Sequence, residues 1–503
     1  MNAYPLTILT ILTRLATAIV ALGALVPREA AGQRPARPRL ALAACPATLV
    51  SPSVNAKCGT LTVFENRVKQ SGRTIRLRVM VLPATGPNRA PDPVFFIAGG
   101  PGSSIVEQAA GIARDPSRLR ERRDLVLVDQ RGTGGSHPIN CPFYGPPDSL
   151  QSFLGDFMPP TAVRACRLAF ASNTDLSQYT TTVAVGDLDE VRQALGAEQI
   201  NLTGGSYGTR AAQEYMRRYP TRVRAASLYG LVPPSLAMPQ HFARDAQAAL
   251  DAVIGECGAD AACRAAFPRL SADVATAFER LRQDAARVTV EHPRSGRAVT
   301  VSLGYDMFAE TLRYMLYSSV DAALVPAAMH KAAGGDFTWW ARRALRERGA
   351  MRGNGMFDGL YLAITCAEDV PRTNPDAEAA EAKGTFLGDY RMRQQKAACA
   401  LWGRSSVPRD FFTPVESKVP ALLVAGANDP VTPPHYASAV GRFLPNSLIV
   451  TVPFGAHALT GLEGISCVDQ LRHDLIERGS IVGLDTSCIA RIKRRGFPTE
   501  LPN

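Results

Sequence analysis

Residues 199–208 read Gln199-Ile-Asn-Leu-Thr-Gly-Gly-Ser-Tyr-Gly208, and this stretch indicates the fold more clearly than any other. It begins with an apolar, strand-like run, and a helix-like run follows at 209–219. Gly204 and Gly208 let the turn between them close without a collision of side chains, which pushes the hydroxyl of Ser206 out above the sheet. A serine on a sharp turn between a strand and a helix is typical of a catalytic nucleophile.

Short apolar strands alternate with helices on both sides of this turn. The alternation predicts a mostly parallel sheet that is covered by helices on both faces, because strands buried on both faces are apolar throughout. A helix is expected at 187–195, with Asp187 as its N-cap and Gly196 as its stop. The expected strands are 61–64, 74–82, 94–98, 125–128, 199–203, 223–228, 421–425 and 448–452.

The alternation breaks after Val232-Pro-Pro234, and helical periodicity dominates up to about residue 413. A helical segment inserted between two stretches of sheet is typical of a lid over a site at the edge of the sheet. The helices expected in this segment are 242–257, 271–286, 305–317 and 322–333. We therefore divide the chain into a signal peptide (1–31), a linker (32–44), a first part of the core (45–234), a helical lid (235–413) and a C-terminal part of the core (414–503).

The N-terminus has the features of a secretory leader, because Arg14 precedes an apolar stretch at 15–26 and small residues follow. Two alternatives remain open. Residues 6–26 could serve as a membrane anchor. Leu42-Ala-Ala-Cys45 is similar to a lipoprotein cleavage box, although the arginines of 33–40 separate it from the apolar stretch. We expect a secreted or periplasmic protein.

Ten cysteines, an even number, fit an exported chain with disulfides. Sequence alone does not fix their connectivity, but the cysteines fall into neighbouring couples, and pairing within each couple closes a short loop. The predicted disulfides are Cys45–Cys58, Cys141–Cys166, Cys257–Cys263, Cys366–Cys399 and Cys467–Cys488.

The net charge of +11 does not point to a nucleic-acid partner, because the arginines are scattered and form no basic stripe. Apart from the leader, no stretch is long and apolar enough to span a bilayer, so no stable membrane insertion is expected after the leader is removed. The sequence does not indicate the oligomeric state.

A serine nucleophile needs a base, and the base needs an acid that orients it. Asp429 follows strand 421–425 directly, where open α/β sheets place residues that handle ligands. His457 lies on a loop after the last expected strand. His435 is the rival base, but Pro433-Pro434 places it in the first turn of a helix, and Asp429 could also be a simple turn residue. We favour Asp429 as the acid and His457 as the base.

Acyl transfer also needs hydrogen-bond donors aimed at the oxyanion that develops on the substrate. One candidate is the main-chain N–H of Tyr207, which directly follows the nucleophile. The glycine-rich loop Gly99-Gly-Pro-Gly102 follows strand 94–98 and lets the backbone approach a substrate closely. We assign the second donor to Gly100, with Gly99 as the alternative. A plain tight turn is the competing interpretation of this loop.

Together these residues resemble the α/β-hydrolase family of prolyl iminopeptidases and tripeptidyl aminopeptidases, over roughly residues 45–488. The resemblance implies the α/β-hydrolase fold with Ser206, Asp429 and His457 as the triad, and an exported bacterial protein of the tripeptidyl aminopeptidase branch. It also implies that the loop 129–136 braces the site, which makes Arg131 a structural residue and not a catalytic one. The matching runs are Gly99-Gly-Pro-Gly102, Asp129-Gln-Arg-Gly-Thr-Gly-Gly-Ser136, Gly204-Gly-Ser-Tyr-Gly-Thr209, Gly426-Ala-Asn-Asp-Pro-Val-Thr-Pro-Pro434 and Gly455-Ala-His457.

Exopeptidases of this family hold the free amino terminus of the substrate with acidic lid residues. The candidates here are Glu368 and Asp369, because a carboxylate pairs well with an ammonium group. An ordinary solvated acidic pair is the alternative.

The expected function is that of a serine aminopeptidase that cleaves short peptides or single residues from free N-termini through an acyl-enzyme. No metal or cofactor is implied. A carboxylesterase or lipase with the same triad is the alternative, because one fold hosts both chemistries. A non-catalytic binding protein on this fold is less favoured.

Overall fold

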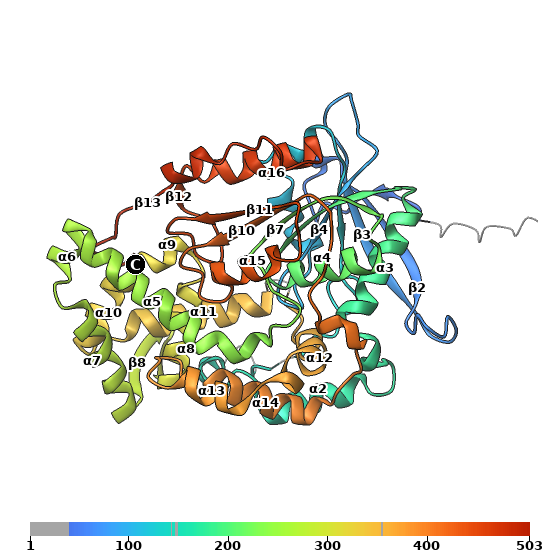
Figure 1. The fold of residues 1–503 in the computed structure, drawn as a ribbon. Coiled ribbons are helices and arrows are strands. Elements are labelled where there is room, and N and C mark those ends of the chain that lie inside the picture. Colours follow the sequence, from blue (N-terminus) through green and yellow to red (C-terminus); the bar gives the residue numbers. More distant parts are fainter. Residues whose placement is uncertain (1–39, 142, 146–148, 354–355, 503) are drawn as a thin grey trace, which may run out of the picture. The chain divides into compact units, whose positions relative to one another are not determined.

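The computed structural model describes residues 40–141, 143–145, 149–353 and 356–502, and the expected signal peptide lies outside them. A nine-stranded sheet runs through the described part in the order β1-β2-β3-β5-β4-β6-β7-β10-β11 (Figure 1). The pairs from β1 to β5 are antiparallel, and those from β5 to β11 are parallel. The strands are β1 (Ala43–Ala44), β2 (Lys57–Phe64), β3 (Thr74–Leu82), β4 (Val94–Ile97), β5 (Leu125–Val128), β6 (Ile200–Gly205), β7 (Val223–Tyr229), β10 (Ala421–Gly426) and β11 (Ser447–Val452).

The register brings the carboxyl ends of the parallel strands to one edge of the sheet. Ile97 lies opposite Gly204, Gly205 lies opposite Tyr229, and Tyr229 lies opposite Val424 on its other side. The loops after these strands carry the predicted site residues, so they meet at this edge.

Helices cover both faces of the sheet, as the apolar strands predict. Along β10, Ala421 and Leu423 belong to one buried cluster, while Leu422 and Val424 belong to another. The first cluster includes residues of α3 (Thr181–Ala194), α4 (Tyr207–Arg218) and α15 (Pro434–Gly441), and the second includes residues of α1 (Ala109–Ile112) and α16 (Ser466–Arg478). A further helix, α2 (Pro160–Phe170), precedes α3.

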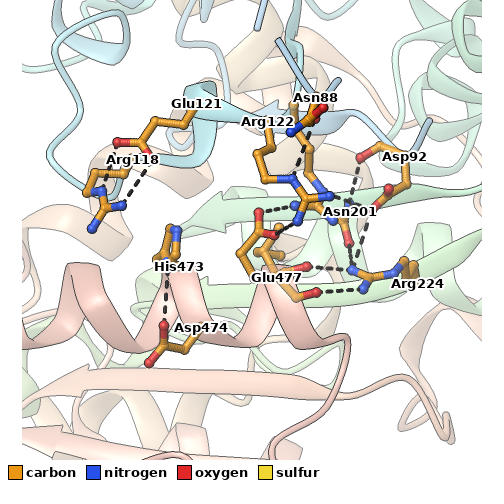
Figure 2. Close-up of polar contacts among 12 residues, drawn as sticks. Asn88, Asp92, Arg118, Glu121, Arg122, Asn201, Arg224, His473, Asp474 and Glu477 are labelled. Atoms are coloured by element: carbon orange, nitrogen blue, oxygen red, sulfur yellow. Dashed lines mark hydrogen bonds and ion pairs between the residues drawn. The ribbon is translucent and has the colours of Figure 1, made fainter. Parts of the chain in front are cut away.

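Polar contacts fix α16 to the start of the central strands (Figure 2). Arg224 donates to the main-chain oxygen of Glu477, at 3.1 Å, and the Glu477 carboxylate accepts from Arg122 at 2.8 Å. Asp92 accepts from the side chain of Asn201 at 2.7 Å and pairs with Arg224 at 3.4 Å. This network lies at the opposite edge of the sheet from the site loops, so it supports the fold without touching the site.

The segment between β7 and β10 is mainly helical and encloses an apolar core of its own (Figure 1). The C-terminal residues Phe497 and Leu501 pack against this core. The boundaries assigned above to the lid and the two core parts stay a prediction. The helices of this segment are α5 (Phe242–Ala259), α6 (Ala261–Ala266), α7 (Leu270–Gln283), α8 (Tyr305–Met315), α9 (Ser319–Ala322), α10 (Val325–Ala333), α11 (Thr338–Gly353), α12 (Asp358–Glu368), α13 (Pro375–Ala382) and α14 (Tyr390–Trp402).

Two local expectations were wrong. Helix α3 begins at Thr181, not at Asp187. Asp187 is an internal residue of the helix, and its side chain pairs with Arg67 and Arg131. The helical segment also contains an unpredicted hairpin, β8 (Ala286–Glu291) and β9 (Ala298–Leu303), with alternating valines that bury one face.

All five predicted disulfides are present: Cys45–Cys58, Cys141–Cys166, Cys257–Cys263, Cys366–Cys399 and Cys467–Cys488. Because the sulfur of Cys45 is bonded to Cys58, the thiol that a lipoprotein would acylate is occupied. Within the described residues, no helix combines the length and the apolar character needed to cross a membrane.

Candidate active site

Ser206 lies at the turn between β6 and α4, with φ 56° and ψ −129°. Such a positive φ is rare for a residue with a side chain and is retained where function needs it. A Cβ atom on Gly204 would come 2.8 Å from the main-chain oxygen of Gly208, and one on Gly208 would come 2.5 Å from that of Ile97. The two glycines are therefore required by the tight turn, as the sequence indicated.

Asp429 and His457 form the hydrogen-bonded pair that a serine nucleophile needs. The Nδ1 atom of His457 lies 2.8 Å from Oδ2 of Asp429. Oδ1 of Asp429 accepts the main-chain N–H groups of Val431 and Thr432, each at 2.8 Å. The hydroxyl of Thr432 donates to Oδ2 at 2.6 Å and also lies 3.1 Å from Nδ1 of His457. Both carboxylate oxygens are thus held in place.

These contacts also set the charge of the acid. Burial works to raise the pKa of Asp429, whose residue is only 2% exposed, but the charge of His457 and the hydrogen bonds from His457 and Thr432 outweigh it and lower that pKa. Asp429 is therefore ionised at neutral pH, and an ionised carboxylate accepts the Nδ1–H of His457. That tautomer leaves the Nε2 atom free to accept a proton.

The ends of β7 and β10 bring these residues to the serine. The N–H of Ser206 donates to the oxygen of Tyr229 at 3.0 Å. A Cβ atom on the next residue, Gly230, would lie 3.1 Å from Cε1 of His457. The same short backbone segment thus borders both the nucleophile turn and the imidazole ring.

The junction between α8 and α9, in the middle of the helical segment, holds the histidine loop. The N–H of Ala458 donates to the oxygen of Tyr317 at 2.7 Å, and the ring of Tyr317 meets that of His457 edge-on, with the centroids 5.1 Å apart. The hydroxyl of Ser319 donates to the oxygen of Phe454 at 3.0 Å. The orientation of His457 therefore depends on residues far from it in the sequence.

The predicted oxyanion loop lies against the nucleophile. A Cβ atom on Gly99 would come 3.3 Å from that of Ser206, and Gly100 has φ +112°. Tyr207 is the first residue of α4, and its phenol oxygen is hydrogen-bonded to Gln130 at 3.0 Å and Thr181 at 2.7 Å, which holds its side chain in place. The arrangement is compatible with N–H donors from Tyr207 and from Gly100 or Gly99.

The loop at 129–136 braces this region. Asp129 accepts from the hydroxyl of Ser104 at 2.6 Å and from the N–H of Gly135 at 3.0 Å. The guanidinium of Arg131 is buried and forms two hydrogen bonds with Asp187, at 2.6 and 2.8 Å. Arg131 is a structural residue, as the resemblance implied.

Glu368 and Asp369, expected to bind the substrate amine, are both enclosed by the protein, and this burial does not favour that role. Both are 0% exposed. Glu368 accepts from the N–H and the hydroxyl of Thr181, at 2.7 and 2.8 Å, and Asp369 accepts from Arg210 at 2.9 Å. The sequence showed the acidic pair but not its burial beneath α3 and α4, and the geometry supports a structural role for both.

Burial leaves Glu368 with a testable property. Desolvation raises its pKa from 4.5 to about 7, although Arg210 and Thr181 oppose the rise. Between these two values the folded state keeps a proton that the unfolded state releases, so the free energy of unfolding falls as the pH rises. Glu368→Gln has no titrating group at this position and serves as the reference. We expect the stability of the wild type relative to Glu368→Gln to drop by on the order of 1–3 kcal/mol from pH 4.5 to pH 8.

Chemical denaturation of both proteins at several pH values measures this difference. A difference that does not change with pH would contradict the assignment of a buried, protonated Glu368. Glu368→Gln should also change kcat/KM for free-amine and N-blocked substrates by the same factor, since the carboxylate of Glu368 does not reach the substrate.

Sequence reasoning missed Thr432 and Tyr317. Thr432 lies within the run that predicted Asp429, three residues after the acid, and this spacing lets its hydroxyl return to the carboxylate. No sequence signal pointed to Tyr317, because its contact with His457 spans 140 positions. His435, the rival base, lies on α15 beside the ring of Tyr436.

Two models of known families match the chain. The model of a family described as alpha/beta hydrolase fold matches residues 92–320, and that of a family described as TAP-like protein matches residues 384–488. Serine protease Hip1 of Mycobacterium tuberculosis is 28% identical over 448 residues, which cover 82% of this chain and 84% of that protein. Tripeptidyl aminopeptidase of Streptomyces lividans is 26% identical over 479 residues, which cover 86% of this chain and 83% of that enzyme.

A shorter match links the chain to proline iminopeptidase of Neisseria gonorrhoeae, at 27% identity over 139 residues that cover 28% of this chain and 32% of that enzyme. The two family models leave a gap at 321–383, and both extend into the helical segment. The relatives that span most of the chain are named as a serine protease and a tripeptidyl aminopeptidase. The chain therefore has the α/β-hydrolase fold, and its similarity to these relatives supports a peptidase-like hydrolase with a TAP-like match in its C-terminal part.

Proposed function

We propose that this protein is an exported serine aminopeptidase that releases short peptides or single residues from free N-termini. The observation that carries the proposal is the hydrogen-bonded pair of His457 and Asp429, next to a serine on a strained turn. Ser206, Asp429 and His457 act as the triad.

The reaction follows from this geometry. His457 takes the proton of Ser206 through Nε2, and the serine oxygen attacks the scissile carbonyl carbon. The main-chain N–H groups of Tyr207 and of Gly100 or Gly99 stabilise the oxyanion. His457 then returns the proton to the leaving amine, and water resolves the acyl-enzyme by the same route in reverse.

Two further observations support the aminopeptidase activity and the export. The relatives that span most of the chain are named as a serine protease and a tripeptidyl aminopeptidase. The five disulfides are typical of a protein that matures in an oxidising compartment. The carboxylates that hold the substrate amine are not assigned, because Glu368 and Asp369 are both buried and both oxygens of Glu368 accept hydrogen bonds from Thr181.

A substrate panel tests the activity. It pairs free and N-blocked peptidyl nitroanilides, including tripeptides that end in Pro or Ala, with nitrophenyl esters of short and medium acyl chains. We expect turnover of the free-amine peptides and at least a tenfold loss on blocking, because an unpaired buried acceptor for the amine is costly. The length of the released peptide identifies the subclass.

Ester turnover without peptide cleavage would replace the proposal with a carboxylesterase. Cleavage of blocked and free peptides at equal rates would indicate an endopeptidase.

A further inference from the structure

A cavity of about 740 Å³ opens within the helical segment and shares no lining residue with the candidate active site. Its walls come from one face of α11, from the hairpin β8–β9 with its turn, and from the 3-10 helix Leu150–Leu154. Leu501 and Pro502, at the C-terminus, close one side. We call it the lid cavity. Its volume is in the range of natural ligand sites.

The floor of the lid cavity is apolar. Leu150, Phe153 and Val290 line it and are 5%, 7% and 2% exposed. Trp339 and Leu345, both partly buried, continue the apolar surface along α11. A ligand that reaches this floor would bury an apolar body against it.

The rim is basic. Lys331, Arg342 and Arg346 line the cavity and are exposed, and the two arginines lie one turn apart on α11. In the part of the chain that the structure describes, none of the three forms an ion pair with a carboxylate. The N–H of Thr338, at 2.9 Å, and the charges of Lys331 and Arg342 lower the pKa of Asp336. With Arg294, the lining holds four basic side chains against two acids, Glu291 and Asp336. The rim therefore carries an excess of positive charge.

We propose that the lid cavity binds a monomeric, single-chain carboxylate amphiphile. Its chain lies on the floor of Leu150, Phe153 and Val290, and its carboxylate lies between Arg342 and Arg346, whose planar guanidinium groups match a carboxylate. The recessed floor favours a ligand that inserts its chain as a monomer over the flat face of a membrane. This site is independent of the triad and of the proposed peptidase activity.

Calorimetric titration of the full-length protein with decanoate, at low ionic strength, tests the proposal. Decan-1-ol is the neutral analogue, and phosphatidylglycerol vesicles represent a lipid surface. We expect one saturable site for decanoate, weaker binding of decan-1-ol, and no retention on the vesicles. Added salt should weaken the binding of decanoate, because exposed charges are screened.

Arg342→Gln/Arg346→Gln should weaken decanoate binding by about tenfold or more, since each guanidinium supplies a charge-assisted hydrogen bond. The matched control is Arg76→Gln/Arg404→Gln, which removes the same charge from exposed positions outside the lid cavity and should retain the affinity within about twofold. Trp339→Gln should also weaken binding through the apolar wall.

Three outcomes would overturn the proposal. They are the absence of saturable binding, equal affinity for decan-1-ol and decanoate, and equal losses in the two double variants. Retention on vesicles without binding of monomeric decanoate would make the rim a membrane contact instead.

Discussion

Ser206→Ala should reduce kcat/KM for every substrate of this protein by about 10⁴- to 10⁶-fold, the largest effect expected of any single substitution. In the proposed mechanism the serine oxygen is the atom that forms the acyl-enzyme, and alanine removes it. Because alanine keeps the Cβ atom and the backbone of the turn, the fold should be unchanged. Steady-state kinetics and thermal unfolding measure the two effects separately.

Labelling with a fluorophosphonate makes this test independent of the substrate. The probe reacts with a serine only when a base activates it. The wild type should be labelled at Ser206, and Ser206→Ala should not be labelled. Ser438→Ala, the same change at an exposed position on α15, is the matched control and should behave as the wild type. A wild type that resists the probe would favour a non-catalytic protein on this fold.

The central strands and the turn at Ser206 could be predicted from the sequence because their signals are local. Strands β4, β5 and β10 are short apolar runs that end at glycine or aspartate, and the structure places them within one or two residues of the expected bounds. Each disulfide likewise joins two cysteines that follow one another in the list of cysteines along the chain, so their order was sufficient to predict the pairing.

Long-range contacts explain what the sequence did not reveal. Asp187 has the residue type of an N-cap, but its pairing with Arg67 and Arg131 places it inside α3, and no local pattern records that pairing. In the same way, the sequence suggested Glu368 and Asp369 as residues that bind the substrate amine, with a solvated acidic pair as the alternative. Their burial depends on contacts with Thr181 of α3 and Arg210 of α4, two helices that are far from them in the sequence.

The proposed triad illustrates both local and long-range signals. Its members could be proposed because each follows a predicted strand. The contacts that orient them come from Thr432, close in sequence, and from Tyr317, which is remote. The positions of these three residues after strands were therefore easier to predict than the interactions that orient them.

Asp429→Asn should lower kcat/KM by about 10⁴-fold while the protein stays folded. Asparagine keeps an oxygen that can accept the N–H groups of Val431 and Thr432. Its amide, however, donates a hydrogen bond towards Nδ1 of His457, whereas the carboxylate accepted one. The imidazole then carries its proton on Nε2 and cannot take the proton of Ser206. Kinetics and unfolding measurements on the variant test this account.

Thr432→Val separates orientation from charge at the same carboxylate. It removes the hydroxyl that donates to Oδ2 of Asp429 at 2.6 Å but leaves the acid and its bond to His457. We expect a loss of only about 10- to 100-fold, and Thr432→Ser should restore most of it because serine supplies the same donor. If Asp429→Asn were no more harmful than Thr432→Val, Asp429 would be a turn residue, and the proton relay through His457 would need another acid. A large gap between the two variants would instead mean that the charge on Asp429, more than its position, makes His457 a base.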